Sequence, residues 1–243
     1  MTKTNARSTK KKVVIGITVA LAAILLVVLL VGNIMYYWWV YPYIWYKRVT
    51  FLTANRSSES GHVVFVGDSI TDGCDLATYY PTLDAYNRGI AGDTTGGLLH
   101  RMDMSIYALN PSLVVLLIGT NDYERSVAHT NEYILRNYER ILSDIHSRMP
   151  DMPVIVQSVY PIADVSFHDH YRYGHGHIEA LNQGIQALCA QYGYVYADVY
   201  SLLVAGDEQM DMRYSADGLH PNDDGYRVIS AFLTPIIEDC LAG

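Results

Sequence analysis

The chain has 243 residues, of which 50% are hydrophobic and 17% are charged, and its formal net charge is −8. This length allows one domain of ordinary size with an appendage, and the hydrophobic content excludes a disordered or collagen-like chain. The three cysteines are too few for a disulfide-stabilised miniprotein, and the chain lacks the Cys-x-x-Cys pair typical of a structural zinc site. The negative net charge disfavours a nucleic-acid partner.

The charge is divided sharply along the chain. Residues 1–48 hold seven of the 17 basic residues and none of the 25 acidic ones. Residues 49–243 therefore carry 10 basic and 25 acidic side chains, which is a net charge of about −15. Two parts with different physical properties are expected in this one chain.

An apolar segment follows a basic tail at residues 1–12. No charged side chain occurs from Val13 to Tyr46, and Val13–Val31 is a 19-residue run interrupted only by small or weakly polar residues. About 20 helical residues cross the ~30 Å hydrocarbon layer of a membrane, so residues 13–35 are predicted to form a transmembrane anchor. A cleaved secretory signal is the alternative. This run is longer than a typical signal core, however, and leads into bulky aromatic residues.

Residues 36–58 are predicted to form an aromatic juxtamembrane belt and a linker. Eight of the eleven residues in Tyr36–Tyr46 are Tyr or Trp, which favour the headgroup boundary of a membrane. Pro42 disfavours an undisturbed helix through this belt, and residues 47–60 are expected to be a short polar connector. More basic residues precede the apolar run than follow it. The positive-inside rule therefore predicts a single-pass cell-membrane protein with a cytoplasmic N-terminus and an extracellular domain.

The outer part, residues 59–243, alternates short β-branched runs with longer amphipathic stretches. Strands are expected at residues 62–66, 85–90, 113–118, 154–158 and 194–199, and helices at residues 95–108, 130–148, 178–192 and 223–241. This alternation predicts an α/β domain, a three-layer α/β/α sandwich around a mainly parallel five-stranded sheet. Ligands of such sheets bind beyond the carboxyl ends of the strands.

The first strand ends in the motif Gly67-Asp68-Ser69-Ile70-Thr71. A serine that leaves a buried strand at a glycine turn can present its hydroxyl group at the edge of the sheet. Asp and Ser are also favoured as helix caps, so the pentapeptide alone is equally compatible with a capping role. It is not the G-x-S-x-G elbow of α/β-hydrolases, because Thr71 stands in place of the second glycine.

Two further motifs follow predicted strands. The sequence Gly119-Thr120-Asn121-Asp122 would bring the Asn121 amide near Ser69, where an N–H group can stabilise an oxyanion. Considered alone, these residues are also ordinary turn formers. The stretch NRGIAGDTTGG at residues 87–97 has glycines that allow close approach to a ligand, but its spacing is not that of a G-x-G-x-x-G dinucleotide-binding loop.

The last motif is Asp217-Gly218-Leu219-His220-Pro221-Asn222. An aspartate and a histidine three residues apart can form a hydrogen-bonded pair, in which the carboxylate accepts from one imidazole nitrogen. The other nitrogen can then take a proton from a serine. The alternative is a surface loop that caps the last helix.

In their order along the chain, these motifs resemble those of the SGNH (GDSL) hydrolase family over essentially the whole outer domain. The similarity is to its small single-domain esterase branch, which includes platelet-activating-factor acetylhydrolase subunits and lysophospholipase-like esterases. The resemblance implies a flavodoxin-like SGNH fold and a catalytic triad of Ser69, Asp217 and His220. It also implies an oxyanion hole made by the backbone N–H groups of Ser69 and Gly92 and the side-chain amide of Asn121. It implies neither a metal nor an organic cofactor.

The sequence therefore predicts a membrane-anchored, outward-facing serine esterase that hydrolyses short acyl esters, chiefly acetyl esters, through an acyl-enzyme. The expected partners are a small acyl ester or an acetylated glycan and, through the N-terminal helix, the lipid bilayer; no nucleic acid and no obligate protein partner are inferred. An outer domain near −15 would be repelled by anionic lipid headgroups. An O-acyltransferase acting on cell-envelope glycans with the same triad is the alternative, and a non-catalytic surface-binding module is a third.

Other residues carry weaker signals. The segment FHDHYRYGHGH contains four histidines, His168, His170, His175 and His177. These side chains are candidate metal ligands, but a mobile loop at the rim of the site is the favoured interpretation. Cys74 lies five residues after Ser69, whose own pairing leaves no need for a cysteine nucleophile. Cys189 and Cys240 lie in predicted helices and are expected to be buried thiols. Most tyrosines from residue 160 onward are expected to be packing residues, although some could stack on sugars.

Overall fold

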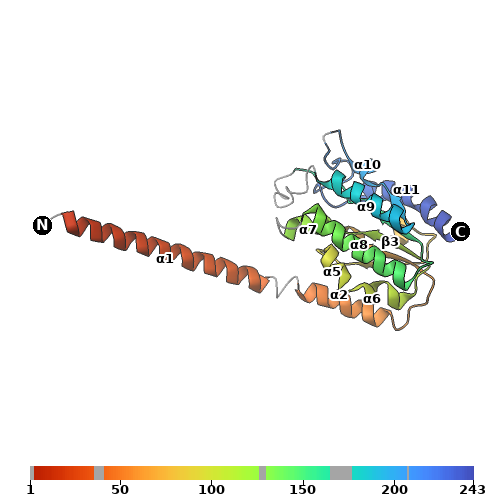
Figure 1. Cartoon of the computed structure of the whole chain (residues 1–243), viewed down its shortest axis with the longest axis horizontal. Helices are drawn as coiled ribbons and strands as arrows, with labels where there is room; N and C mark the ends of the chain where they lie inside the picture. Colours follow the sequence, from red (N-terminus) through yellow and green to blue (C-terminus); the bar gives the residue numbers. More distant parts are fainter. Residues whose placement is uncertain (1–2, 36–40, 126–129, 165–176, 207) are drawn as a thin grey trace. The chain divides into compact units, whose positions relative to one another are not determined.

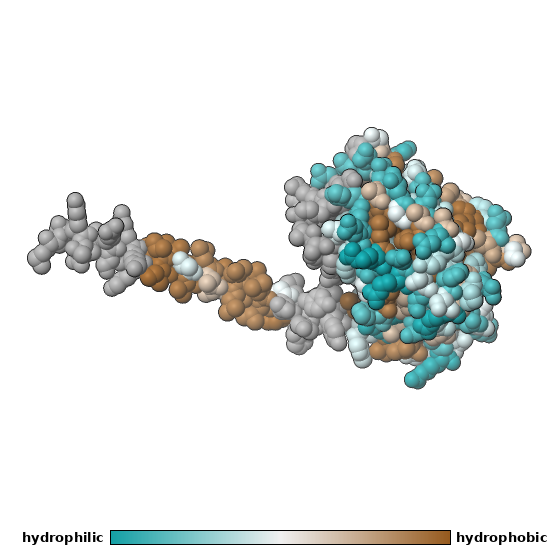
Figure 2. All heavy atoms as spheres, in the orientation of Figure 1, coloured by the Kyte–Doolittle hydropathy of each residue, from teal (hydrophilic) through white to brown (hydrophobic). Residues whose placement is uncertain are grey.

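The computed structural model describes residues 3–35, 41–125, 130–164, 177–206 and 208–243, and the chain divides into two compact units, residues 1–49 and 50–243 (Figure 1). The first unit contains helix α1 (Lys3–Met35). Within it, Val13–Gly32 is long and apolar enough to cross a membrane, and none of that span is buried. Figure 2 shows the hydrophobic surface that this leaves along α1. The apolar run expected at residues 13–35 is therefore helical as far as Met35.

A second helix, α2 (Tyr41–Ala54), occupies part of the segment expected to be a belt and a polar connector. Pro42 lies in its first turn, where the missing N–H group removes no helical hydrogen bond. The connector expected from residue 47 thus begins as helix. The reason is Phe51, which is only 3% exposed and lies beneath Arg88, whose guanidinium carbon is 4.8 Å from the ring centre. Asn55 follows the helix and accepts a hydrogen bond of 2.9 Å from Arg88.

The second unit is built on a five-stranded sheet in the order β2-β1-β3-β4-β5, in which every pair of neighbours is parallel. The strands are β1 (Val63–Gly67), β2 (Ala85–Gly89), β3 (Leu113–Leu117), β4 (Val154–Gln157) and β5 (Val195–Ala197). All five expected strands form, and the order is the flavodoxin-like one. The register pairs Gly67 with both Gly89 and Leu117, so β1, β2 and β3 end level with one another.

Helices cover both faces of this sheet (Figure 1). They are α3 (Ser69–Asp72), α4 (Leu76–Tyr79), α5 (Thr95–Leu99), α6 (Met102–Ser105), the 3-10 helix η2 (Tyr107–Leu109), α7 (Thr120–Arg125), α8 (Asn131–Arg148), α9 (Ile178–Tyr192), α10 (Tyr200–Leu203) and α11 (Asp223–Ala242). The helices expected at residues 130–148, 178–192 and 223–241 are confirmed as α8, α9 and α11 within one or two residues.

The strands alternate their side chains between two apolar layers. Val64 and Val66 of β1 pack in one buried cluster with residues of α8 and α9, whereas Val63 and Phe65 pack in the other with residues of α11. A strand covered on both faces has no polar side, which is why its sequence is continuously apolar. The expected three-layer α/β/α sandwich is therefore confirmed.

The single helix expected at residues 95–108 is wrong. The segment forms α5, α6 and η2 instead, and the chain leaves helical geometry at Arg101, where φ is −132°. Gly96 and Gly97 weaken the first turn of a long helix, because glycine loses more backbone freedom there than other residues. The break lets the side chain of Arg101 turn inward, and this residue is 1% exposed.

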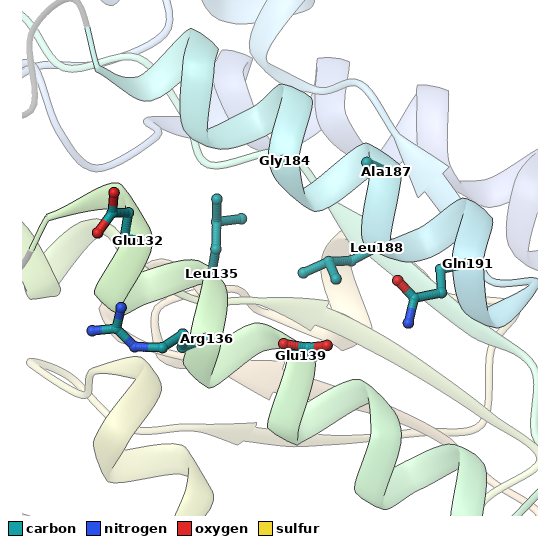
Figure 3. Close-up of a pocket in the computed structure, with 8 residues that line it drawn as sticks. All are labelled: Glu132, Leu135, Arg136, Glu139, Gly184, Ala187, Leu188 and Gln191. Atoms are coloured by element: carbon teal, nitrogen blue, oxygen red, sulfur yellow. The ribbon is translucent and has the colours of Figure 1, made fainter.

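A surface groove of about 420 Å³ lies between α8 and α9 (Figure 3). The two helices pack closely because Gly184 of α9 faces Leu135 of α8: a Cβ atom at Gly184 would lie 2.6 Å from the nearest leucine methyl group. Leu135 and Leu188 are among its apolar lining residues, and Glu132 and Arg136 are among its charged ones. None of the residues predicted to form the active site lines this groove.

Candidate active site

Ser69, His220 and Asp217 form one hydrogen-bonded chain. The Oγ atom of Ser69 lies 3.0 Å from Nε2 of His220. The Nδ1 atom of the same imidazole lies 2.7 Å from Oδ2 of Asp217. The structure thus brings together three side chains from the two ends of the outer domain, in the order that the sequence predicts. Nucleophile, base and orienting carboxylate in this geometry are the arrangement needed for nucleophilic catalysis by a hydroxyl group.

The carboxylate of Asp217 is held in its charged form. Burial alone would raise its pKa, but hydrogen bonds from the His220 imidazole and from the backbone N–H groups of His220 and Leu219 outweigh that effect. The two backbone bonds end on Oδ1, at 2.8 Å and 2.9 Å, which leaves Oδ2 for the imidazole. The net result is a pKa well below the usual range of an aspartate, so Asp217 is ionised at neutral pH.

Ser215 was not anticipated from the sequence and fixes the shape of this loop. It is fully buried, its Oγ atom accepts from the N–H of Gly218 at 2.9 Å, and it lies 2.8 Å from the carbonyl oxygen of His220. Ser215 also pairs with Pro221 in an antiparallel bridge that closes the loop. Asn222 caps α11 by accepting from the N–H of Gly225. The motif therefore also caps the last helix, as the alternative interpretation expected, and Asn222 is the residue that does so.

Ser69 reaches His220 because it begins α3 directly after β1. Asp68, the preceding residue, caps this helix: its Oδ1 atom accepts from the N–H of Ile70 at 3.0 Å. The capping role weighed for the first motif thus falls to Asp68. Gly67 allows the turn, because a Cβ atom there would lie 2.2 Å from the carbonyl oxygen of Leu117 and equally close to Thr71.

Asp68 itself lies in unusual electrostatic surroundings. It is 0% exposed, and burial, only partly offset by the hydrogen bond from Ile70, raises its pKa to about 7. The neighbouring carboxyl groups of Asp93 and Asp122 raise the pKa further, whereas the guanidinium of Arg101 lowers it. Asp68 is thus a buried carboxyl group in the residue directly before the serine.

Gly92 and Asn121 lie on the two turns that flank Ser69. Gly92 follows β2 with φ at +75°, a left-handed conformation that glycine adopts without strain. Asn121 lies at the start of α7, after β3, is 4% exposed, and donates from Nδ2 to the carbonyl oxygen of Asp93 at 2.9 Å. Since β1, β2 and β3 end level, the backbone of Ser69, the backbone of Gly92 and the amide of Asn121 follow three adjacent strand ends.

The weaker sequence signals fall outside this site or are chemically quiet. His168, His170 and His175 lie outside the described residues, and His177 immediately precedes α9. In the part of the chain that the structure describes, no group of three or more His, Cys, Asp or Glu side chains could hold a metal ion. Burial raises the pKa of Cys74 and of Cys189 to about 12, so neither thiol is ionised at neutral pH. Cys240 is only partly buried.

A serine, a histidine and an aspartate hydrogen-bonded in this order, at the carboxyl edge of a parallel α/β sheet, are the arrangement found in serine hydrolases. The chain belongs to the GDSL-like lipase/acylhydrolase family, whose model matches residues 65–228.

Two platelet-activating factor acetylhydrolase subunits are similar to part of this chain. Platelet-activating factor acetylhydrolase IB subunit alpha1 of Bos taurus is 29% identical over 113 residues, which is 44% of this chain and 47% of that protein. The alpha2 subunit of Homo sapiens is 32% identical over 104 residues, 41% of this chain and 44% of that protein. The chain therefore matches about half the length of these relatives.

Similar solved structures cover more of the chain. A Streptococcus pneumoniae protein, provisionally described as a platelet activating factor, matches with a TM-score of 0.77 and 27% identity. The match covers 87% of this chain and 98% of that protein's chain. A GDSL-like lipase of Bacteroides thetaiotaomicron has a TM-score of 0.72 and 27% identity and covers 79% of this chain and 97% of its own. Both likenesses support the fold and family expected from the four motifs.

Proposed function

We propose that this protein is a membrane-anchored serine esterase that hydrolyses short acyl esters, with Ser69, His220 and Asp217 as its catalytic triad. The observation that carries the proposal is the unbroken contact from Ser69 through His220 to Asp217, at 3.0 Å and 2.7 Å. The His220 side chain is 41% exposed and Ser69 is half-buried, so neither residue is enclosed in the core.

In the proposed first step, Oγ of Ser69 attacks the carbonyl carbon of the ester and its proton passes to Nε2 of His220. Asp217 accepts the Nδ1–H bond and stabilises the imidazolium that forms. The tetrahedral intermediate collapses, the C–O bond to the alcohol breaks, and His220 returns the proton to the leaving oxygen. In the second step water attacks the acyl carbon while His220 takes its proton. The bond between that carbon and Oγ of Ser69 then breaks, His220 returns the proton to Oγ, and the carboxylic acid is released.

The proposed oxyanion hole consists of the backbone N–H groups of Ser69 and Gly92 and the Nδ2–H group of Asn121. Donors that are fixed before the reaction stabilise the developing negative charge without having to reorganise. Two features support this assignment: the adjacent strand ends that carry the donors, and the hydrogen bond of 2.9 Å that fixes the Asn121 amide on the Asp93 carbonyl.

The proposed substrates are short acyl esters, with acetyl esters foremost, and acetylated glycans of the cell envelope are the favoured carriers. The relatives named acetylhydrolases support an acetyl group. The charge of about −15 on residues 49–243 disfavours anionic phospholipid, because like charges keep the domain away from its headgroups.

The proposed location is the outer face of a cell membrane. The exposed apolar span Val13–Gly32 supports an anchor, and the basic side chains of residues 1–12 support a cytoplasmic N-terminus.

The triad is tested with purified full-length protein in detergent micelles, a chromogenic acetyl ester and an alkyl phosphonate that reacts with activated serines. Ser69→Ala should abolish both hydrolysis and labelling while leaving the Tm nearly unchanged. Ser143→Ala is the matched control, because the Ser143 hydroxyl on α8 only contacts a backbone carbonyl of its own helix. His220→Ala should be as damaging as Ser69→Ala, and Asp217→Ala milder. Full hydrolysis by the Ser69→Ala protein would overturn the proposal.

A further inference from the structure

We propose that Arg101 is a positioning residue for the oxyanion hole, a role that rests on the proposed function above. Its side chain is 0% exposed, so it acts through the groups it binds and not by touching a substrate in solution. Arginine is rarely buried to this degree unless its charge and its donors are satisfied.

The guanidinium of Arg101 joins three segments of the chain. Nε donates to Oδ2 of Asp93 at 2.6 Å, and one terminal nitrogen donates to the carbonyl oxygen of Gly67 at 2.8 Å. The other terminal nitrogen donates to the carbonyl oxygen of Arg88 and to Oγ of Ser105, both at 2.8 Å. These bonds use the planar fork of donors that distinguishes arginine from the compact ammonium group of lysine.

Two of the anchored groups are neighbours of the serine turn. Gly67 is the last residue of β1, two positions before Ser69, and its carbonyl oxygen accepts from Arg101 and from the N–H of Ile90. Arg88 lies next to the end of the neighbouring strand, β2. Arg101 therefore fixes the ends of β1 and β2 relative to each other.

Asp93, which Arg101 also binds, connects it to the other two proposed oxyanion donors, the backbone of Gly92 and the amide of Asn121. Asp93 directly follows Gly92, and its backbone carbonyl accepts the bond from the Asn121 amide at 2.9 Å. Its carboxylate is divided between two bonds, Oδ2 to Arg101 and Oδ1 to the N–H of Thr94 at 3.0 Å. A shift of Asp93 would thus move the backbone at Gly92 and the amide of Asn121 together.

This placement predicts an effect on the transition state alone. Oxyanion donors act on charge that develops during the reaction, and a misplacement of about 1 Å can lower the rate by roughly 100-fold. Ground-state binding of a neutral ester does not depend on that charge. Loosening Arg101 should therefore lower kcat and leave KM nearly unchanged.

The experiment uses the full chain in detergent micelles and compares Arg101→Lys, which keeps the charge but not the fork, with Asp93→Asn, which keeps the shape but removes the ionic bond. Each should lower kcat for an acetyl ester by about 10- to 100-fold with KM changed less than about 3-fold. The affinity for a small alkyl boronic acid, which forms a tetrahedral adduct on the serine, should fall in parallel with kcat. The double variant should lose less than the product of the two single losses, since both substitutions weaken the same contact between Arg101 and Asp93.

Arg148→Lys is the matched control. Arg148 also donates to a carboxylate, Asp103, at 2.7 Å, but it lies on the surface of α8 and should keep wild-type kcat and boronic acid affinity. Each variant is assayed at a temperature where its thermal melt shows it fully folded. If Arg101→Lys does not fold, Asp93→Asn decides the question.

Wild-type kcat in the folded variants, or a raised KM with unchanged kcat, would overturn the role of Arg101. The failure of the proposed function looks different: the wild-type protein itself would not be labelled by the phosphonate at Ser69.

Discussion

Asn121 carries two hydrogen-bonding duties at once: its amide is fixed on the carbonyl oxygen of Asp93 and is proposed to donate to the oxyanion. Asn121→Ala should therefore lower kcat for an acetyl ester by about 100- to 1,000-fold, and should raise KM much less, because the lost interaction acts on transition-state charge. Steady-state kinetics of the two proteins measure this split.

The control for that substitution is Asn131→Ala. Asn131 lies in the first turn of α8, and its amide also donates to a backbone carbonyl, that of His177, at 2.8 Å. It has no proposed part in the reaction, so kcat should stay within about 2-fold of the wild-type value. Equal losses in both variants would mean that Asn121 acts only as a structural residue.

The buried carboxyl group of Asp68 should make stability depend on pH in the opposite sense to most aspartates. Its pKa is raised from 3.8 to about 7 in the folded protein, so between these values the folded state binds a proton that the unfolded state does not. Because the folded state then binds more protons, this group makes the free energy of unfolding fall as pH rises through that window. The penalty is complete above pH 7.

Asp68→Asn removes the ionisable group and keeps an oxygen that can accept from the N–H of Ile70. The variant should gain more in Tm over the wild-type protein at pH 8 than at pH 5, as measured by thermal melts across that range. A gain independent of pH would mean that the charge of Asp68 does not penalise the fold. Asp75→Asn is the control, since Asp75 also caps a short helix but is fully exposed.

At the scale of elements, the spacing of apolar residues decides which helices and strands can be predicted from the sequence. Strands β1, β3 and β4 and helices α8, α9 and α11 are predicted to within about one residue at each end, because each has a continuous apolar run or an apolar stripe at helical spacing. Strands β2 and β5 lack such a run, and β5 is three residues long where the sequence predicts residues 194–199. The prediction of one helix at residues 95–108 is wrong, because Arg101 turns inward to bind the carbonyl groups of Gly67 and Arg88. Both partners lie outside the segment, so the spacing of apolar residues within it cannot reveal these bonds.

The same limit applies to the candidate site. Ser69, Gly92 and Asn121 stand in recognisable motifs after predicted strands, and Asp217 and His220 stand in a recognisable motif before the last helix. Ser215 acts through bonds to the backbone of its own loop, and Asp93 through bonds to Arg101, Thr94 and Asn121. Neither residue type nor spacing marks such bonds in a sequence.

Helix α2 leads to a prediction about where the folded unit starts. Phe51 is 3% exposed whereas its neighbour Leu52 is 52% exposed. Phe51→Ala should destabilise the outer domain by about 3 kcal/mol, because a buried aromatic ring is lost from its contact with Arg88. Leu52→Ala, the matched control, should change stability by less than about 0.5 kcal/mol. Thermal and denaturant unfolding of the full chain in micelles measures both.

This prediction also places the boundary of the outer domain. A fragment of residues 50–243 should melt at a higher temperature than one of residues 59–243, since only the longer one retains Phe51 and Asn55. Both should hydrolyse an acetyl ester, because the proposed triad lies wholly within residues 59–243. Equal melting temperatures would return the boundary to the connector expected from the sequence.

At the scale of the whole molecule, the two units differ in charge and in the environment that suits them. An exposed apolar span such as Val13–Gly32 is stable in lipid but not in water. The intact protein should therefore partition into detergent, and the fragment of residues 50–243, which lacks both the span and the aromatic belt, should stay in the aqueous phase. N-terminal sequencing of membrane-derived protein should find the chain uncleaved. A soluble product beginning after residue 30 would identify the apolar run as a cleaved signal.

The contact between Ser69 and His220 joins residues 151 positions apart. Under the proposed topology the N-terminal anchor enters the membrane first, and Ser69 leaves the ribosome long before its base has been synthesised. The serine is therefore a weak nucleophile throughout export. Hydrolytic activity can begin only when the segment that carries His220 has been synthesised and has folded against the serine turn. The separation of 151 residues thus delays catalysis until the two segments have met, and confines it to the compartment in which the domain folds.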